Sequence, residues 1–246
     1  FRMSTQGILV RYIALDDELE RINLIEPWIR RLEGERIPGV LGSLGCSHYD
    51  EQQRLNRFGF SMSTGEIGCF LAHRKCWQES LRANLPILVL ESDVAKPDIE
   101  AVKALLPELL ARHKYYDVVR LHGLFPQNDR FRRSIVKLSE GRTLCQTFGD
   151  AMGAAAYIVT PKAAAGLLEM SDSFFVPVDV FLAETWRHRL RFRTVWPYVF
   201  ELEPFSTVIG QRRRPKQTKL ERLRIECSRA KDDLRRVLYL PRHYFG

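Results

Sequence analysis

The chain has 246 residues, enough for one large domain with or without a short appendage. Its 45% hydrophobic content supports a real core, but its longest aliphatic run, residues 87–90, is far shorter than the roughly 20 residues that span a membrane. The net charge of +8 arises in residues 211–246, which hold 12 Lys or Arg and 4 Asp or Glu, whereas residues 1–210 hold 26 of each. The neutral body argues against nucleic-acid binding, and the basicity belongs to a tail.

The N-terminal part predicts a strand, a helix and a glycine-rich loop. The apolar stretch 8–15 is rich in β-formers and predicts the first strand. Asp16 and Asp17 can cap a helix that extends to about Leu32, in which apolar residues recur at helical spacing. Residues 34–45 predict a loop around a short strand.

A second helix has the clearest start signal in the chain. In Ser63-Thr64-Gly65-Glu66, the side chains of Ser63 and Glu66 can satisfy each other's free backbone amides, as in a capping box. The helix should end near Ala83, and a strand over residues 86–90 should follow at once. Four consecutive aliphatic residues are typical of a strand buried on both faces, as in a parallel sheet covered by helices.

Helices and strands continue to alternate toward the C-terminus. Pro161, capped by Thr160, is suited to the first position of a helix, and residues 122–140 resemble a polar surface excursion. The alternation predicts an α/β domain over residues 3–210, with a mainly parallel sheet and helices on both faces, followed by a basic amphipathic tail over residues 211–246. The further expected elements are helix 99–112, strand 117–121, strand 153–160, helix 162–170, helix 180–187 and strand 192–195.

Two carboxylates, Glu91 and Asp93, follow the buried strand directly. Ligands of open α/β sheets bind outside the carboxyl ends of the strands. Carboxylate oxygens are the ligands that Mg²⁺ and Mn²⁺ prefer, and such ions commonly bridge protein and phosphate. The pair therefore indicates a site for a divalent cation and a diphosphate, with a simple cap of the next turn as the alternative.

The helix over residues 63–83 carries Glu66, Cys69, His73 and Cys76 on one flank. A zinc site would need a further ligand, such as Cys46 or His48, and this spacing within one helix is not typical of structural zinc. Buried structural thiols are therefore the preferred interpretation. The five cysteines, odd in number and without a disulfide-rich spacing, favour a reducing cytoplasm; they are Cys46, Cys69, Cys76, Cys145 and Cys227.

Asp179 lies between apolar neighbours after Pro177. It could cap the following helix. It could equally act as a general base, because desolvation raises the pKa of a carboxylate toward a useful range.

The tail combines a narrow apolar stripe with many basic residues. Such a helix can lie on an anionic membrane surface or dock on the protein body, and the pattern leaves both open. RNA binding is a weaker alternative, because no aromatic residues are interleaved with the arginines. The stripe consists of Leu220, Leu223, Cys227, Ala230, Leu234 and Val237.

Several of these segments, in their order and spacing, resemble glycosyltransferase family 25, which includes lipopolysaccharide and lipooligosaccharide glycosyltransferases and collagen-type galactosyltransferases. The resemblance is strongest at Thr64-Gly-Glu-Ile-Gly-Cys-Phe-Leu-Ala-His73, which is close to the family's Gly-Glu-Ile-Gly-Cys…His signature. It begins at residues 11–16 and continues through residues 87–94, 156–157 and 177–179.

The resemblance implies a single GT-A-like domain that binds a nucleotide sugar. It further implies an inverting transfer, with UDP-galactose as the expected donor, to a hydroxyl group of a lipopolysaccharide or lipooligosaccharide glycan. A divalent cation, Mn²⁺ or Mg²⁺, would be held by Asp93 and Glu91, with His188 as a later metal contact. Asp179 is the expected base for the acceptor hydroxyl, and Asp150 is the second choice.

Other residues are expected to position the donor. Arg11, Glu66 and His73 are the candidates, beside Glu91 and Asp93, and the arginines at 212–214 could contribute if the tail folds back. The lipid-linked or oligosaccharide acceptor would place the enzyme in the bacterial cytoplasm, peripheral at the inner face of the inner membrane. There each basic residue of the tail contributes about 1 kcal/mol of attraction to an anionic surface.

The chain departs from the family pattern at two positions. The family usually has Glu-Asp-Asp where this chain has Glu91-Ser92-Asp93, and Ser before the histidine where this chain has Ala72. Three alternatives remain: a transferase for another sugar or a protein acceptor, a non-catalytic glycan-binding relative, and nucleic-acid binding by the tail. Ser92 is the feature that keeps the non-catalytic alternative open.

Overall fold

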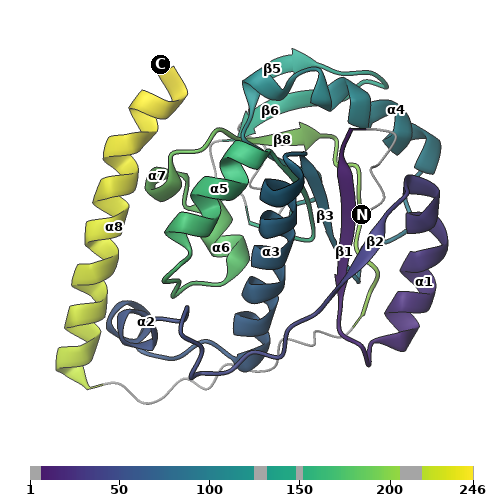
Figure 1. Cartoon of the computed structure of the whole chain (residues 1–246). Helices are drawn as coiled ribbons and strands as arrows, with labels where there is room; N and C mark the ends of the chain where they lie inside the picture. Colours follow the sequence, from purple (N-terminus) through teal and green to yellow (C-terminus); the bar gives the residue numbers. More distant parts are fainter. Residues whose placement is uncertain (1–6, 125–131, 148–151, 206–217, 246) are drawn as a thin grey trace.

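The computed structural model describes residues 7–124, 132–147, 152–205 and 218–245, and Figure 1 shows how they are arranged. One eight-stranded sheet forms the middle layer, in the order β2-β1-β3-β7-β4-β8-β6-β5. The strands are β1 (Leu9–Ala14), β2 (Glu35–Pro38), β3 (Ile87–Glu91), β4 (Val118–Arg120), β5 (Arg132–Lys137), β6 (Thr143–Thr147), β7 (Ala156–Val159) and β8 (Phe192–Trp196).

Helices cover both faces of the sheet, as predicted, and each face has its own hydrophobic core. Leu88 and Leu90 of β3 pack toward α1 and α4, whereas Ile87 and Val89 pack toward α3, α5 and α6. This alternation explains why the strand is aliphatic throughout. The helices are α1 (Leu19–Ile29), α2 (Glu51–Phe58), α3 (Thr64–Ala83), α4 (Ile99–Leu110), α5 (Pro161–Met170), α6 (Val178–Ala183), α7 (Thr185–His188) and α8 (Lys219–Phe245).

The sheet is mixed, so the prediction of a mainly parallel sheet is wrong. The pairs β1–β2, β1–β3 and β4–β8 are parallel, but β7 runs antiparallel between β3 and β4. The antiparallel strands β6 and β5 extend the sheet beyond β8. Strand β5 lies within residues 122–140, so the expectation of a surface excursion there is also wrong in part. Its charged, largely exposed side chains fit an edge strand and hide the usual alternation.

The capping signals are confirmed at two helices and need correction at two others. Ser63 and Glu66 form the expected capping box of α3, and Thr160 caps α5 ahead of Pro161. Helix α1 begins after Glu18 rather than at the preceding aspartates. The helix expected over residues 180–187 is two short helices, α6 and α7, separated at Glu184, whose backbone is not helical.

The last helix, α8, lies on the outside of α2 and α7 (Figure 1). Its Asp232 is 7% exposed and forms ion pairs with Arg57 of α2 at 2.9 Å and Arg187 of α7 at 3.3 Å. Ile225 is buried on the same side. The apolar stripe predicted for this helix is turned away from the body wherever its side chains are described. None of the described helices is long and apolar enough to cross a membrane.

Asp117, just before β4, forms hydrogen bonds that join β4 to the start of β8. Its carboxylate accepts hydrogen bonds from the Arg191 backbone at 2.7 Å and from the Arg191 guanidinium at 2.8 and 3.0 Å. Burial alone would raise the pKa of Asp117, but the bonds from Arg191 outweigh it and lower the pKa.

We predict that Asp117→Asn lowers the free energy of unfolding at pH 7 by about 2 kcal/mol, because it weakens charge-assisted hydrogen bonds. A carboxylate whose pKa is lowered by folding stabilises the protein above its unfolded pKa of about 3.9 and loses that contribution as the pH falls through the folded value. The difference between wild type and variant, measured by urea denaturation, should therefore shrink below about pH 4. A difference that stays constant down to pH 3 would contradict this role.

Candidate active site

A cleft of about 640 Å³ opens beside the carboxyl ends of β1, β2 and β3. These three strands are parallel neighbours, so their ends meet at one edge of the sheet, where α/β proteins bind ligands. The first turns of α3 form the opposite wall, at Thr64 and Gly65. The predicted acids Glu91 and Asp93 both line this cleft.

The described residues satisfy the Asp93 carboxylate only in part. Its Oδ1 is buried and has no hydrogen-bond partner in the described part of the chain. Burial, followed by the negative charge of Glu91, raises the pKa of Asp93 to about 6, although the charge of Arg21 opposes the shift. An unsatisfied buried carboxylate oxygen next to a second carboxylate fits a hard divalent cation, and Asp93 and Glu91 are the residues that would hold it.

Ser92 lies between these acids and points to a further carboxylate. Its hydroxyl donates to Glu18 Oε2 at 3.3 Å, and Glu18 also lines the cleft. Glu18 in turn accepts the Leu15 amide at 2.8 Å and pairs with Arg21 at 3.1 Å. An acid from the start of α1 thus lies beside the position where the family pattern has its middle acid. Sequence reasoning did not select Glu18; its only signal was a place just after the first strand.

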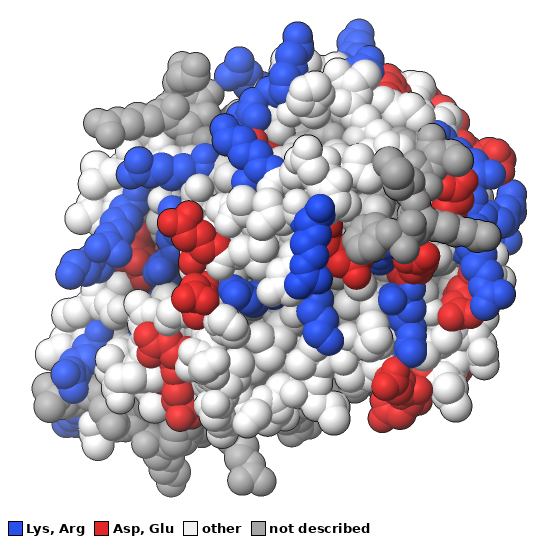
Figure 2. Space-filling view, viewed as in Figure 1, with Lys and Arg blue, Asp and Glu red and all other residues white. Residues whose placement is uncertain are grey.

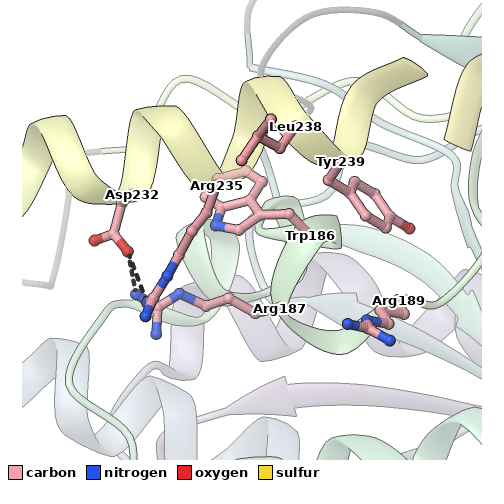
Figure 3. A pocket seen from close by; sticks show the side chains of 7 residues that line it. All are labelled: Trp186, Arg187, Arg189, Asp232, Arg235, Leu238 and Tyr239. Atoms are coloured by element: carbon pink, nitrogen blue, oxygen red, sulfur yellow. Dashed lines mark hydrogen bonds and ion pairs between the residues drawn. The ribbon is translucent and has the colours of Figure 1, made fainter. Parts of the chain in front are cut away.

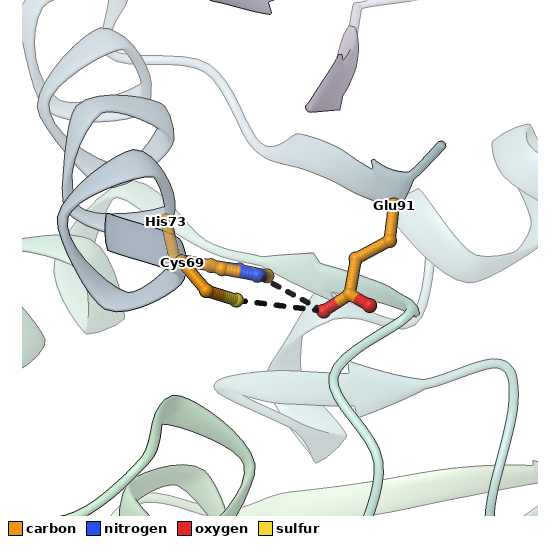
Figure 4. Close-up of side chains that lie close together, drawn as sticks. All are labelled: Cys69, His73 and Glu91. Atoms are coloured by element: carbon orange, nitrogen blue, oxygen red, sulfur yellow. Dashed lines mark hydrogen bonds and ion pairs between the residues drawn. The ribbon is translucent and has the colours of Figure 1, made fainter. Parts of the chain in front are cut away.

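Two side chains of α3, Cys69 and His73, approach the same carboxylate oxygen of Glu91, as Figure 4 shows. His73 Nε2 is 3.3 Å from Glu91 Oε1, and Cys69 Sγ is 4.0 Å from the same atom. On its other side, His73 Nδ1 is 2.7 Å from the hydroxyl of Tyr157. His73 is fully buried, whereas the Glu91 side chain is 28% exposed toward the cleft.

The Cys69 thiol identifies which predicted acids converge. Burial raises the pKa of Cys69 well above its usual range, and the charges of Glu91, Asp179, Asp93 and Glu66 raise it further. Four acids selected from three separate segments therefore lie near enough to this thiol for their charges to act on it. Asp179 reaches this neighbourhood from the first turn of α6.

The three potential ligands Cys69, His73 and Glu91 lie within 4.8 Å of one another. This set differs from the zinc set considered from the sequence, because Cys76 is buried elsewhere, in reach of the charges of Glu79 and Arg11. A structural zinc site has four protein ligands, and only these three lie together among the described residues. The donor set therefore fits hydrogen bonding to Glu91 better than zinc binding.

Two other candidates lie away from these acids. Arg11, 4% exposed, pairs with Glu79 at 2.6 Å and with Glu35 at 3.0 Å, so its guanidinium ties β1 to α3 and β2. His188 is buried, with Nε2 2.9 Å from the Leu182 carbonyl and Nδ1 accepting from the Leu190 amide. Both ring nitrogens therefore serve local structure. Asp150 and the arginines at 212–214 lie outside the described residues.

His122 is a buried histidine near the candidate acids that sequence reasoning did not select. It follows β4 at the same edge of the sheet, and the charge of Glu91 reaches it. Its Nδ1 donates to the Phe200 carbonyl at 3.0 Å, whereas its Nε2 is buried without a partner among the described residues. The available signal was its position directly after a predicted strand parallel to β3.

A close approach of two backbones shapes the wall of the cleft. A Cβ on Gly68 of α3 would lie 2.0 Å from the Val40 carbonyl oxygen, and a Cβ on Gly42 would lie 2.1 Å from the Thr64 carbonyl oxygen. Only glycine lets the loop after β2 pack directly on the first turns of α3.

Comparisons with known proteins agree with the resemblance found in the sequence. Residues 32–182 match the family described as glycosyltransferase family 25 (LPS biosynthesis protein). A glycosyltransferase 25 family member from Anopheles gambiae is 28% identical over 151 aligned residues, which cover 54% of this chain and 24% of that protein. The chain thus spans about a quarter of the length of this curated relative.

A solved structure is also similar at low identity. It is the mannose-1-phosphate geranyltransferase from Thermus thermophilus, with a TM-score of 0.34 and 13% identity over 74% of this chain and 64% of that chain.

We predict that Gly68→Ala destabilises the protein by about 1–3 kcal/mol, because the added methyl group meets rigid backbone. Gly166→Ala is the matched control: it is also a helical glycine, but it has open space around its Cβ position. It should stabilise the protein by up to about 1 kcal/mol. Urea denaturation measures both, and equal stability of the two variants would contradict the tight packing.

Proposed function

Because this chain belongs to glycosyltransferase family 25, we propose that it transfers a hexose from a nucleotide sugar to a hydroxyl group of a glycan. The proposal rests on one observation above all, the unsatisfied Asp93 Oδ1 beside Glu91 in the cleft. The proposed donor is UDP-galactose, the proposed fold type is GT-A-like, and the proposed acceptor is a lipopolysaccharide or lipooligosaccharide glycan of a bacterium.

A divalent cation, Mn²⁺ or Mg²⁺, held by Asp93 and Glu91, would neutralise the charge that builds up on the departing diphosphate. The other walls of the cleft come from α3 and from the loop after β2. The cleft wall at Thr64 and Gly65 borders the space beside these acids, and Glu66 caps the same turn. Loop 39–42 closes the cleft from the side of β2.

Asp179 is the proposed base for the acceptor hydroxyl. It comes from the first turn of α6, whereas the proposed metal ligands come from the end of β3 and the turn after it, and the charges of all three act on the Cys69 thiol. An inverting transfer needs its base on the face of the sugar opposite the leaving group. The convergence of Asp179 with Glu91 and Asp93 on one thiol supports this assignment.

We predict that Asp93→Asn and Asp179→Asn both lower turnover by at least about 100-fold, but for different reasons. The first should also weaken Mn²⁺ binding, whereas the second should leave Mn²⁺ and UDP binding intact. A donor screen with Mn²⁺ present identifies the sugar, and titration calorimetry measures cation and UDP binding. Absence of turnover with every donor in the wild-type protein would favour a non-catalytic glycan-binding relative, which Ser92 supports.

We also propose that α8 holds the enzyme on the cytoplasmic face of an anionic membrane, where a lipid-linked acceptor is available. The face of α8 opposite Asp232 exposes Leu223 to 62%, Leu234 to 59% and Val237 to 59%. Exposed basic residues flank these side chains, and basic side chains project along the outer edge of the molecule (Figure 2). An apolar stripe flanked by cations matches an anionic bilayer in both polarity and charge.

The neighbouring cleft between α7 and α8 adds to this surface. It has a volume of about 590 Å³, and Figure 3 shows Arg189, Trp186 and Leu238 around it. Arg187 and Arg235 also line it but share Asp232 as an ion-pair partner. The exposed Arg189 beside apolar walls suits an anionic headgroup with its acyl chains.

We predict that the double variant Leu234→Glu/Val237→Glu lowers binding to vesicles containing phosphatidylglycerol at least tenfold, because it puts anions into the apolar stripe. Transfer to a soluble acceptor should stay unchanged. The control is Leu24→Glu on α1, where the leucine is 54% exposed on another helix. Flotation assays measure binding. Unchanged flotation would refute the membrane proposal.

A further inference from the structure

Four side chains from three elements form a continuous hydrogen-bond chain that ends at the candidate cation site. Trp77 Nε1 is 3.0 Å from the Tyr157 hydroxyl oxygen, and that oxygen is 2.7 Å from His73 Nδ1. His73 Nε2 is 3.3 Å from Glu91 Oε1. Trp77, Tyr157 and His73 are each fully buried.

The chemistry of tryptophan fixes the direction of this chain. The indole N–H can only donate, so the Tyr157 oxygen must accept from Trp77. The hydroxyl hydrogen then has one acceptor among the described residues, His73 Nδ1. If His73 Nδ1 carried the proton, the Tyr157 oxygen would accept twice and its own hydrogen would be buried without a partner. The satisfied arrangement puts the imidazole proton on Nε2, which donates to Glu91.

The direction matters because it decides which oxygen of Glu91 stays available. Both His73 and the weaker donor Cys69 approach Oε1. Glu91 Oε2 has no hydrogen-bond partner within the ranges that the structure describes, and Glu91 lines the cleft next to Asp93. One oxygen of Glu91 is thereby held by the protein, and the other is left for a ligand.

We propose that Trp77, Tyr157 and His73 act as positioning residues that lock the Glu91 carboxylate, with Oε2 turned to the cation beside Asp93. This rests on the cation of the proposed function. Metal-binding carboxylates depend on such outer hydrogen bonds, and losing one typically costs 10–100-fold in metal affinity or activity. In this assignment His73 donates a hydrogen bond to Glu91, which binds the cation, and does not bind the cation itself.

The first test is the tautomer of His73, read from long-range ¹H–¹⁵N NMR spectra of protein labelled at histidine nitrogen. The signals of His73 are assigned by their loss in His73→Gln. We expect the Nε2–H tautomer in the wild-type protein. Tyr157→Phe removes the middle of the chain and should shift His73 toward a mixture of tautomers. An Nδ1–H tautomer in the wild-type protein would overturn the proposal.

The second test is direct Mn²⁺ binding, measured by electron paramagnetic resonance of free Mn²⁺ in the presence of UDP. His73→Gln can place an amide N–H where Nε2 lies, and we expect its Mn²⁺ affinity within about threefold of wild type. His73→Asn places its amide where Nδ1 lies, and its affinity should fall 10–100-fold. His113→Asn, at an exposed histidine on the surface, is the control. Thermal melts show whether each variant is folded.

The outcomes separate this inference from the function on which it rests. Equal Mn²⁺ affinity of wild type, His73→Gln and His73→Asn, all folded, would refute the positioning role and leave the cation site intact. No Mn²⁺ binding by the wild-type protein would refute both the proposed cation and the role of the chain in orienting its ligand. Loss in His73→Asn with rescue in His73→Gln supports the proposal.

Discussion

The burial of the Asp93 carboxylate close to the charge of Glu91 is the constraint on which the site depends. Glu91 is the last residue of the buried strand β3 and Asp93 follows two residues later, and burial together with the charge of Glu91 raises the pKa of Asp93 to about 6. The nearby cation, Arg21, is already paired with Glu18. Two neighbouring anions, one of them with a buried oxygen that lacks a partner among the described residues, are costly unless a cation or proton joins them. Backbone hydrogen bonds hold the two acids in place despite this cost. The Glu91 amide donates to the Ala155 carbonyl, and the Val94 amide donates to the Glu91 carbonyl.

The rest of the fold serves to hold other groups against this pair. Helix α3 is pressed against the loop after β2 by the contact at Gly42 and Gly68, so its flank is placed close to the end of β3. From that flank Cys69 and His73 both point to one oxygen of Glu91. Strand β7 adds Tyr157 from the opposite side of the histidine. The antiparallel direction of β7 is therefore part of the site, because Tyr157 pairs with Val89 in β3, two residues before Glu91.

Local signals in the sequence predicted most elements, whereas side-chain partners and strand direction were beyond them. The Ser63 capping box and the aliphatic strand were readable because hydrogen bonding and burial there depend on a few neighbouring residues. The direction of β7 was not readable, because a buried strand has the same composition in either direction. Arg11 shows a related limit: its partners Glu79 and Glu35 are 68 and 24 positions away, so nothing local showed that its charge is paired within the protein.

Helix α8 has the predicted apolar stripe, but the sequence did not show which face of the helix is buried. The apolar stripe exists, but the helix is attached through its opposite face, by Ile225 and by ion pairs of Asp232 with Arg57 and Arg187. A charged anchor between two arginines fixes the orientation of the helix without using its leucines. Hydrophobic burial alone would have favoured the reverse face, because each exposed leucine forgoes about 2 kcal/mol of burial. The ion pairs thus keep the apolar stripe exposed to solvent, which is the arrangement that the proposed membrane docking requires.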